Sequence, residues 1–433
     1  MRRLLKNCAV LATDGQGNFN LIKDGCLGIN DTVIDYVGTG ISGEGYDEIK
    51  DMKGAVLMPG LVNAHGHGPM TLLRGAGSGL SLQDWLNNVI FPVEDKMKPE
   101  DIAAGEKWAV IEMLRGGTTL VSEMYDFPWA SGEVLKESGM KANICRVGLS
   151  FSEDTEIPPN RFNECVDLVK NWEDSSDRVK AEFCIHSEYL TNEKFVRRIA
   201  EINSQLHANI NVHVSETKKE HEECKQRHNG LTPIRYLNSC GILDENTYAA
   251  HCVWVDDGDI DIMLDKKVSP VFNPSSNCKL ASGFSPVTKM LAKGINVAIG
   301  TDGVASNNNL NMFEELHIAS LITKCTALDP TLTPASQVLK MATVNGARAL
   351  NRHDTGEIRV GKKADITAVS LDAPHMYPAF DIMNLLVYSA QASDVVMTMV
   401  DGKILYDNGV YTTIDVEKAV FEMNRALERL GLV

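Results

Sequence analysis

Paired cysteines are absent from this sequence: its ten cysteines lie scattered from Cys8 to Cys325, with no CxxC among them. This absence excludes the small cytidine-type zinc deaminases, which hold their metal with such pairs. Long apolar segments are absent too, and none follows the basic N-terminus. The sequence therefore predicts neither a signal peptide nor a membrane span, and we expect a cytoplasmic protein with reduced cysteines.

Positive charge is also scarce. The chain has 42 lysines and arginines against 58 aspartates and glutamates, which gives a formal net charge of −16 and a pI of about 5.2. This balance argues against nucleic acid or an anionic membrane as a partner. The 433 residues, 44% hydrophobic and 23% charged, are ordinary for a soluble globular protein and numerous enough for two domains.

Three sections of the chain differ in their residue pattern. Residues 1–57 contain β-like runs separated by turns, without a helical period. Residues 58–354 alternate apolar, β-rich runs with amphipathic helical stretches. Residues 355–433 return to turn-then-strand patterns and end in a helical stretch over residues 416–430. We expect the first and last sections to form one small composite β-sandwich domain beside a larger middle domain.

The middle section predicts an α/β fold of the (β/α)8 TIM-barrel type. Its eight predicted strands lie at residues 61–67, 118–124, 143–148, 181–186, 209–214, 248–253, 268–273 and 296–302. Helical stretches fall between them, among them residues 102–114, 193–205, 286–291 and 310–322. Catalytic residues of such barrels lie at the C-terminal ends of the strands, so the residues at these ends are the candidates for a site.

The first predicted strand ends in a His-x-His pair, His65 and His67. Side chains alternate along a strand, so the two imidazoles point the same way. Two imidazoles at one strand end suit a borderline-soft metal such as zinc. The pair also occurs by chance, and alone it is weak support for a metal site.

Three further candidates end other predicted strands: His213 the fifth, His251 the sixth and Asp302 the eighth. Each alone has an ordinary explanation, because a histidine in an apolar run is often a hydrogen-bonded core residue and Asp302 could start a turn. Five such residues at strand ends of one barrel instead predict a metal site. Three histidines and one carboxylate can hold one divalent ion and leave a position for water.

Glu216 follows His213 by three residues and is a candidate proton carrier. A carboxyl group just beyond the strand end can face the same cavity and carry a proton between water and substrate. The alternative is an exposed position at a helix N-terminus, where acidic residues are also favoured. The adjacent metal ligand favours the catalytic interpretation.

With these residues in place, the chain resembles the amidohydrolase superfamily of the mononuclear type over nearly its whole length. Within it, the chain is most similar to the 5′-methylthioadenosine/S-adenosylhomocysteine deaminases. The stretches that carry this similarity are 69–75, 91–94, 186–187, 213–217, 273–277 and 300–308. Guanine deaminases and triazine hydrolases share the metal motif, so the motif alone does not select a substrate.

The resemblance implies a hydrolytic deaminase that converts the 6-amino group of an adenine nucleoside to the 6-oxo form and releases ammonia. The implied substrates are 5′-methylthioadenosine, S-adenosylhomocysteine and adenosine. The implied metal ligands are His65, His67, His213 and Asp302. Two-metal relatives bridge their ions with a carboxylated lysine after the fourth strand, where this chain has none, so we expect one ion. Zinc is the expected metal, although iron and manganese take the same ligands.

The resemblance also implies roles at the substrate. The implied catalytic residues are Glu216, His251 and Asp302; the implied substrate-binding residues are Glu94, His186, Arg146, Arg161, Glu216 and Asp302. Glu94 and His186 would hold the ribose hydroxyls, and Arg146 and Arg161 would approach the carboxylate of the homocysteine tail. Whether His251 touches the metal stays open. Glu94 could instead be a surface residue, and Arg146 a salt-bridge partner.

The resemblance also bears on the assembly, the ligand and the shape of the pocket, and it leaves alternatives open. A homo-oligomer is implied, and a small purine nucleoside is the expected ligand. The main alternative is another aminohydrolase of the same superfamily, acting on guanine, a pterin or a chlorotriazine; a non-catalytic scaffold is the remaining one. Gly68 departs from the bulkier residue that relatives carry there, which predicts a reshaped pocket floor.

Overall fold

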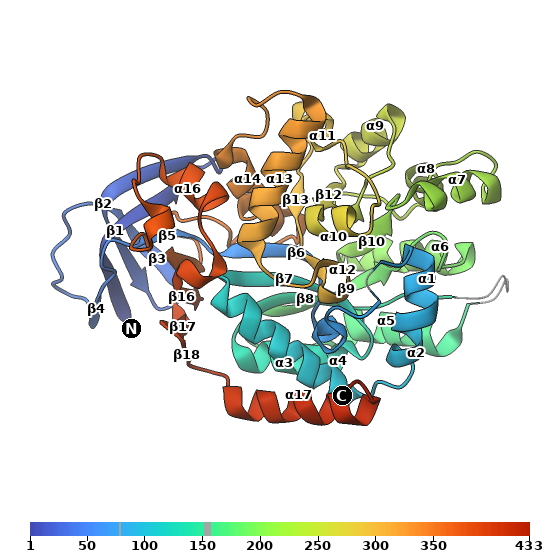
Figure 1. Ribbon diagram of the computed structural model, residues 1–433, viewed down its shortest axis with the longest axis horizontal. Helices are drawn as coiled ribbons and strands as arrows, with labels where there is room; N and C mark the ends of the chain where they lie inside the picture. The colour runs from blue at the N-terminus through green and yellow to red at the C-terminus, as the bar shows by residue number, and fades with distance from the viewer. Residues whose placement is uncertain (78, 151–156) are drawn as a thin grey trace.

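A barrel of parallel strands lies at the centre of the structure, a computed structural model that describes residues 1–77, 79–150 and 157–433 (Figure 1). The barrel strands are β6 (Leu61–His67), β7 (Thr118–Tyr125), β8 (Lys141–Arg146), β9 (Val179–Ile185), β10 (Ile210–Val214), β11 (Thr247–His251), β12 (Ser269–Phe272), β13 (Ala298–Ile299) and β14 (Asp302–Gly303). They pair in the order β13-β12-β11-β10-β9-β8-β7-β6-β14. The predicted (β/α)8 barrel is confirmed.

The eighth predicted strand is split into β13 and β14, and this split closes the barrel. β13 pairs with β12 on one side, and β14 pairs with β6 on the other. Between them, Thr301 forms two hydrogen bonds with the side chain of Asn63. The Thr301 N–H donates to Asn63 Oδ1 at 2.9 Å, and Asn63 Nδ2 donates to Thr301 Oγ1 at 2.8 Å. The residue that follows, Asp302, is thereby turned towards the end of β6.

Helices connect and cover the barrel strands. They are α1 (Leu82–Trp85), α2 (Phe91–Glu94), α3 (Pro99–Arg115), α4 (Pro128–Ser138), α5 (Pro159–Asn171), α6 (Glu193–Leu206), α7 (Lys218–Arg227), α8 (Pro233–Ser239), α9 (Asp257–Lys266), α10 (Pro274–Lys279), α11 (Val287–Ala292), α12 (Val304–Asn307), α13 (Met312–Ala327), α14 (Ala335–Met341), α15 (Val344–Ala349), α16 (Ile382–Tyr388) and α17 (Val416–Leu430). The C-terminal α17 lies along α3 at the lower edge of Figure 1. Among the described residues, no helix is long and apolar enough to cross a membrane.

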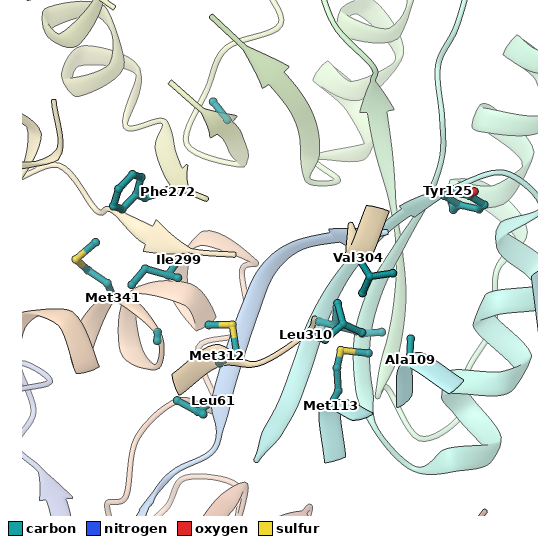
Figure 2. Close-up of a cluster of buried hydrophobic side chains, with 14 of the residues drawn as sticks. Leu61, Ala109, Met113, Tyr125, Phe272, Ile299, Val304, Leu310, Met312 and Met341 are labelled. Atoms are coloured by element: carbon teal, nitrogen blue, oxygen red, sulfur yellow. The ribbon is translucent and has the colours of Figure 1, made fainter. Parts of the chain in front are cut away.

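Amphipathic sequence explains these helices, and α6 is an example. The Asn192 side chain accepts a hydrogen bond from the N–H of Phe195 and so caps the first turn. Phe195, Val196 and Ile199 are buried on one face of the helix, as the helical period requires. Figure 2 shows part of the large core under the helices, with Met113 from α3, Met312 from α13 and Leu61 from β6.

Both ends of the chain build a second sheet beside the barrel (Figure 1). Its strands are β1 (Arg2–Thr13), β2 (Phe19–Asn30), β3 (Val33–Gly38), β4 (Glu48–Asp51), β5 (Val56–Pro59), β15 (Ile366–Val369), β16 (Val395–Val400), β17 (Lys403–Asp407) and β18 (Val410–Tyr411). The order is β18-β17-β16-β15-β5-β1-β2-β3, with β4 on β1. The N-terminal and C-terminal strands therefore meet where β15 pairs with β5.

Both faces of β1 contribute buried side chains. Along β1, Leu5 and Val10 lie in a small core of the sheet itself, whereas Ala9 and Leu11 join the large core that includes the barrel helices. From Ala9 to Leu11 successive side chains point to opposite faces of the strand, and register shifts between Leu5 and Val10 bring Leu5 to the same side as Val10. β1 and β2 have 12 residues each, more than the short runs that the sequence predicts.

A buried ion-pair cluster ties the barrel to the second sheet. Lys141, on β8, places its Nζ 2.6 Å from Asp365 Oδ2 and 2.8 Å from Asp401 Oδ1. The side chains of Lys141 and Asp365 are 3% and 1% exposed. Removal of one partner would leave an uncompensated buried charge, so the three residues hold the two sheets in one arrangement.

Candidate active site

A cavity of about 700 Å³ opens at the C-terminal ends of the barrel strands. Nine of the ten predicted site residues line it: Glu94, Arg146, Arg161, His67, His186, His213, Glu216, His251 and Asp302. The tenth, His65, is fully buried. Its ring centroid lies 4.9 Å from that of His67 and 4.8 Å from that of His213. The structure thus brings all ten predicted residues to one end of the barrel.

Five of these side chains converge on one point. The nitrogen and oxygen ligand atoms of His65, His213, His251 and Asp302 all lie within 4.8 Å of one another. His67 adjoins this group, because its Nε2 is 3.2 Å from Asp302 Oδ1 and 3.4 Å from His213 Nε2. Four imidazoles and one carboxylate with this spacing form a donor set that suits a divalent ion.

The hydrogen bonds of the histidines fit a metal. His67 Nδ1 lies 2.6 Å from the carbonyl oxygen of Met124, and His213 Nδ1 lies 2.7 Å from that of His186. A carbonyl accepts from N–H, so each Nε2 keeps a free lone pair, as metal-binding histidines require. Among the described residues, neither ring nitrogen of buried His65 has a hydrogen-bond partner, and its Nε2 lies 3.5 Å from Asp302 Oδ1. Burial lowers the pKa of His65 to about 4, which keeps it in the neutral, ligating form.

Asp302 is held as an ionised carboxylate facing the histidines. Its Oδ2 accepts hydrogen bonds from Ser276 Oγ at 2.6 Å and Ser306 Oγ at 2.8 Å. Burial acts to raise the pKa of Asp302, but the facing imidazoles outweigh it and hold the pKa well below its usual range. Oδ1 is therefore available to an ion or a reacting proton.

Three residues at this site have left-handed backbone. His251 has a φ of 72°, Asp302 a φ of 63° and Ser215, next to Glu216, a φ of 51°. Left-handed backbone is unfavourable for residues other than glycine, at about 1–3 kcal/mol each. At these three positions the left-handed backbone turns the chain sharply at the end of a strand and directs neighbouring side chains into the cavity.

Glu216 is positioned by the start of α7. Glu220, in the first turn, accepts from the N–H groups of Ser215 at 2.8 Å and Glu216 at 2.7 Å, and Thr217 caps the helix. Glu216 is therefore 6% exposed and lines the cavity, rather than lying in solvent at the helix N-terminus. Burial, together with nearby Asp302, raises its pKa to about 8, a value suited to proton exchange near neutral pH.

His251 has a partner on each side of its ring. Asn277 Nδ2 donates to Nδ1 at 3.0 Å, and Nε2 lies 3.8 Å from Glu216 Oε2. The ring is fully buried, and burial lowers its pKa to about 4, so it stays neutral. With Nδ1 accepting, Nε2 carries the proton and points towards the carboxylate of Glu216.

Glu94 and His186 also line the cavity. The Tyr125 hydroxyl donates to Glu94 Oε1 at 2.5 Å, and burial raises the pKa of Glu94 to about 7. The His186 ring centroid is 4.7 Å from that of His213, so His186 lies next to the metal-type cluster. Apolar side chains that include Leu82, Trp85, Leu86, Ile90 and Phe91 line the wall.

Arg146 and Arg161 both form ion pairs with Asp126, which sequence reasoning missed. Arg146 Nη1 contacts Asp126 Oδ1, and Arg161 Nη1 lies 2.9 Å from the same oxygen. Arg146 Nε also lies 2.7 Å from Glu164 Oε2. The salt-bridge alternative for Arg146 therefore describes this structure, and contact of either arginine with substrate stays a prediction. The signal for Asp126 was its position just after the end of β7.

Gly68 leaves room for a pair of buried carboxyl groups, not for a larger pocket. Its N–H donates to Glu123 Oε2 at 2.8 Å. A Cβ at Gly68 would lie 2.8 Å from both Glu123 Oε2 and Glu106 Oε2, closer than real contacts allow. Gly68 does not line the cavity, so the expected change in the pocket floor is wrong. The glycine instead fits the turn after His67 against the pair.

Glu106 predicts a measurable pH dependence of stability. It is fully buried, and neither carboxyl oxygen makes a hydrogen bond within the described part of the chain. Burial raises its pKa to about 8, although the nearby Ser131 hydroxyl acts to lower it. Since an unfolded glutamate loses its proton near its ordinary pKa of about 4.5, the folded state binds more protons between these values. We expect the free energy of unfolding to fall as pH rises towards 8. Glu106→Gln should flatten this fall, measured as melting temperature from pH 6 to 8.5.

A matched control is Glu100→Gln, on the same helix but exposed, with a side chain that is 65% exposed. We expect this variant to keep the pH profile of the parent protein. An unchanged profile in Glu106→Gln would contradict the assignment of the buried proton to this residue.

The chain is similar to known proteins over nearly its whole length. The family model described as Amidohydrolase family matches residues 56–405. A 5-methylthioadenosine/S-adenosylhomocysteine deaminase of Thermoanaerobacter pseudethanolicus is 41% identical over 99% of both chains. A 5′-deoxyadenosine deaminase of Methanosarcina acetivorans is 40% identical over 99% of this chain and 98% of its own. A crystal structure of an adenosine deaminase from Xanthomonas campestris, with bound zinc, has a TM-score of 0.94, 32% identity and coverage of 100% and 99%.

Proposed function

Because the chain belongs to the amidohydrolase family, we propose that it is a metal-dependent hydrolytic deaminase of adenine nucleosides. It replaces the 6-amino group by an oxo group and releases ammonia. The proposed substrates are 5′-methylthioadenosine, S-adenosylhomocysteine and adenosine, in line with the names of the relatives. The observation that carries the proposal is the convergence of the histidine–aspartate cluster and Glu216 in one cavity at the C-terminal ends of the barrel strands.

One divalent ion, zinc by preference, is proposed to bind His65, His67, His213 and Asp302. The free Nε2 atoms and the partnerless nitrogens of His65 support this choice, and the similar zinc-bound structure supports the metal. When bound to these residues, such an ion would lower the pKa of a water molecule beside it and so make hydroxide available near neutral pH. His251 lies close enough to be a ligand, but its protonated Nε2 suits a hydrogen-bond donor to the attacking oxygen.

The protein's own side chains then handle the protons. Glu216, buried and with a raised pKa, accepts the proton of the attacking water and delivers it to the purine ring nitrogen next to C6. Asp302, ionised and facing the histidines, accepts a proton and passes it to the leaving ammonia. The apolar wall that includes Trp85 and Phe91 excludes competing water from the purine.

Glu94 and His186 are proposed to bind the ribose. A carboxylate suits the two hydroxyls of a diol, and the Tyr125 hydroxyl fixes the orientation of Glu94. We expect Glu94→Gln to lower kcat/KM for adenine nucleosides by about tenfold to a hundredfold, the range of a hydrogen bond to a charged group. Turnover of a free base should hardly change. Equal losses on nucleoside and free base would refute a ribose contact.

The test of the function is an ultraviolet assay on protein of known metal content. Conversion of the adenine ring to hypoxanthine changes its absorbance, so 5′-methylthioadenosine, S-adenosylhomocysteine, adenosine and guanine can be compared directly. We expect turnover of the adenine nucleosides and none of guanine. Silence of the metal-loaded protein on every adenine nucleoside would overturn the proposal and direct the search to free bases, pterins and triazines. A protein without metal and without hydrolytic activity would instead support a scaffold.

A further inference from the structure

The carboxylate of Asp126 lies between two guanidinium groups at one side of the cavity. Asp126 follows the end of β7, Arg146 ends β8, and Arg161 lies in the first turn of α5. Arg146 Nη1 and Arg161 Nη1 both donate to Asp126 Oδ1, the second at 2.9 Å. All three side chains line the cavity. The carboxylate of Asp126 therefore binds both of the arginines that line the cavity, since Arg161 Nη2 also lies 3.4 Å from Asp126 Oδ2.

The charges of this cluster are balanced. Arg146 has a second carboxylate partner in Glu164, whose Oε2 lies 2.7 Å from Arg146 Nε. Arg161 Nη1 also lies 3.3 Å from the carbonyl oxygen of Val147. Among the described residues, two guanidinium groups thus meet two carboxylates. The donors Arg146 Nε, Arg146 Nη1, Arg161 Nη1 and Arg161 Nη2 each have a carboxylate partner. An incoming carboxylate would have to compete with Asp126 for them.

The cluster lies beside the proposed ribose site. Tyr125, which donates to Glu94, directly precedes Asp126 in the chain. The next residue, Phe127, has a φ of 51° and lines the cavity with 38% of its surface exposed. A 5′ substituent that extends beyond the ribose on this side therefore meets Asp126 and the aromatic ring of Phe127.

The relatives differ in the 5′ substituents that their names include. S-adenosylhomocysteine carries a carboxylate and an ammonium group, whereas methylthio and 5′-deoxy substituents carry no charge. The chain is 41% identical to a relative of the first description and 40% identical to one of the second, so overall identity does not separate them. The charge of the cluster distinguishes the two kinds of substrate, because guanidinium groups bind a substrate carboxylate best when they are not already paired.

We propose that Asp126 is a specificity-determining residue that neutralises Arg146 and Arg161 and selects adenine nucleosides with an uncharged 5′ substituent over those that carry a carboxylate. This inference rests on the proposed function and refines it. Displacement of Asp126 by a substrate carboxylate breaks one ion pair to form another and also removes the incoming charge from water, so it costs free energy. An apolar tail leaves the cluster intact and packs against Phe127.

The first test needs no variant. On the wild-type protein, kcat/KM should be at least about tenfold higher for 5′-methylthioadenosine than for S-adenosylhomocysteine, the effect of one charge-assisted hydrogen bond. The decarboxylated analogue of S-adenosylhomocysteine, which keeps the ammonium group, should recover activity towards the higher value. A preference for S-adenosylhomocysteine would overturn the inference. Silence on every adenine nucleoside would instead overturn the proposed function, so the two failures are distinct.

The second test is Asp126→Asn, which keeps the shape of the side chain and removes its charge. We expect the ratio of kcat/KM for S-adenosylhomocysteine to that for 5′-methylthioadenosine to rise by about tenfold to a hundredfold. The gain should disappear in the double variant Asp126→Asn, Arg161→Gln. The matched control is Asp257→Asn, an exposed aspartate on α9 paired with Lys289, which should leave the ratio unchanged. An unchanged or lower ratio in folded Asp126→Asn would overturn the inference, the lower ratio by assigning Asp126 to the substrate ammonium group.

Discussion

Glu216→Gln is expected to lower kcat by about 10²–10⁴, the range of general acid–base catalysis, without loss of bound metal. Glutamine keeps the size of the side chain and can still hydrogen bond to Ser282, whose Oγ lies 3.3 Å from Glu216 Oε1. It can neither take a proton from water nor deliver one to the purine. Because this loss concerns the reaction and not binding, KM should change much less than kcat.

Steady-state kinetics with 5′-methylthioadenosine and metal analysis of the same preparation check this expectation. The control is Glu222→Gln, on α7 but with a side chain that is 52% exposed, which should retain the parent kcat. A Glu216→Gln protein with near-normal kcat and normal metal content would show that another group moves the proton.

Asp302→Asn is expected to abolish both turnover and tight metal binding. Loss of a residue that merely supports a metal ligand typically lowers metal affinity by about 10–100-fold. Loss of a proposed ligand, and of its charge beside His65 and His67, should therefore lower affinity by more than about a hundredfold. Zinc titration by calorimetry and metal content after dialysis measure the effect independently of activity.

A second cluster of potential ligands supplies the control for this experiment. Glu188, Cys224 and His228 also group within 4.8 Å, but Glu188 is already paired with Arg227 and with His228. We therefore expect Cys224→Ser to leave the zinc content unchanged. Loss of zinc from Cys224→Ser, with full retention in Asp302→Asn, would assign the metal to Glu188, Cys224 and His228 and contradict the proposed site.

The barrel and the convergence of its strand ends could be predicted because each depends on local pattern. His65, His67, His213, His251 and Asp302 all follow apolar runs that form strands, and the ends of parallel barrel strands necessarily meet. Glu216 could be predicted for the same reason, since it lies three residues from His213. The family resemblance added Glu94 and His186, for which spacing alone carried little information.

The partners of these residues could not be predicted, because they come from elements that are distant in the sequence. Glu106 on α3 meets Glu123 on β7 only after α3 has packed on the barrel. Nothing in the sequence of either segment indicates that the two carboxyl groups meet. The sequence therefore predicts a changed pocket floor at Gly68, where the structure has a turn packed against this pair. The ion pairs of Asp126 likewise depend on how β7, β8 and α5 pack.

The order of strands in the second sheet affects how the chain can fold while the ribosome is still making it. β5 pairs with β1 on one edge and β15 on the other, yet β15 is made only after the whole barrel. Until then β5, with buried Val56, Leu57 and Met58, presents an unpaired apolar edge, a template for wrong association. Lys141 must likewise wait for Asp365 and Asp401. The nascent chain therefore depends on its last strands, and we expect slow folding and a need for chaperones during synthesis.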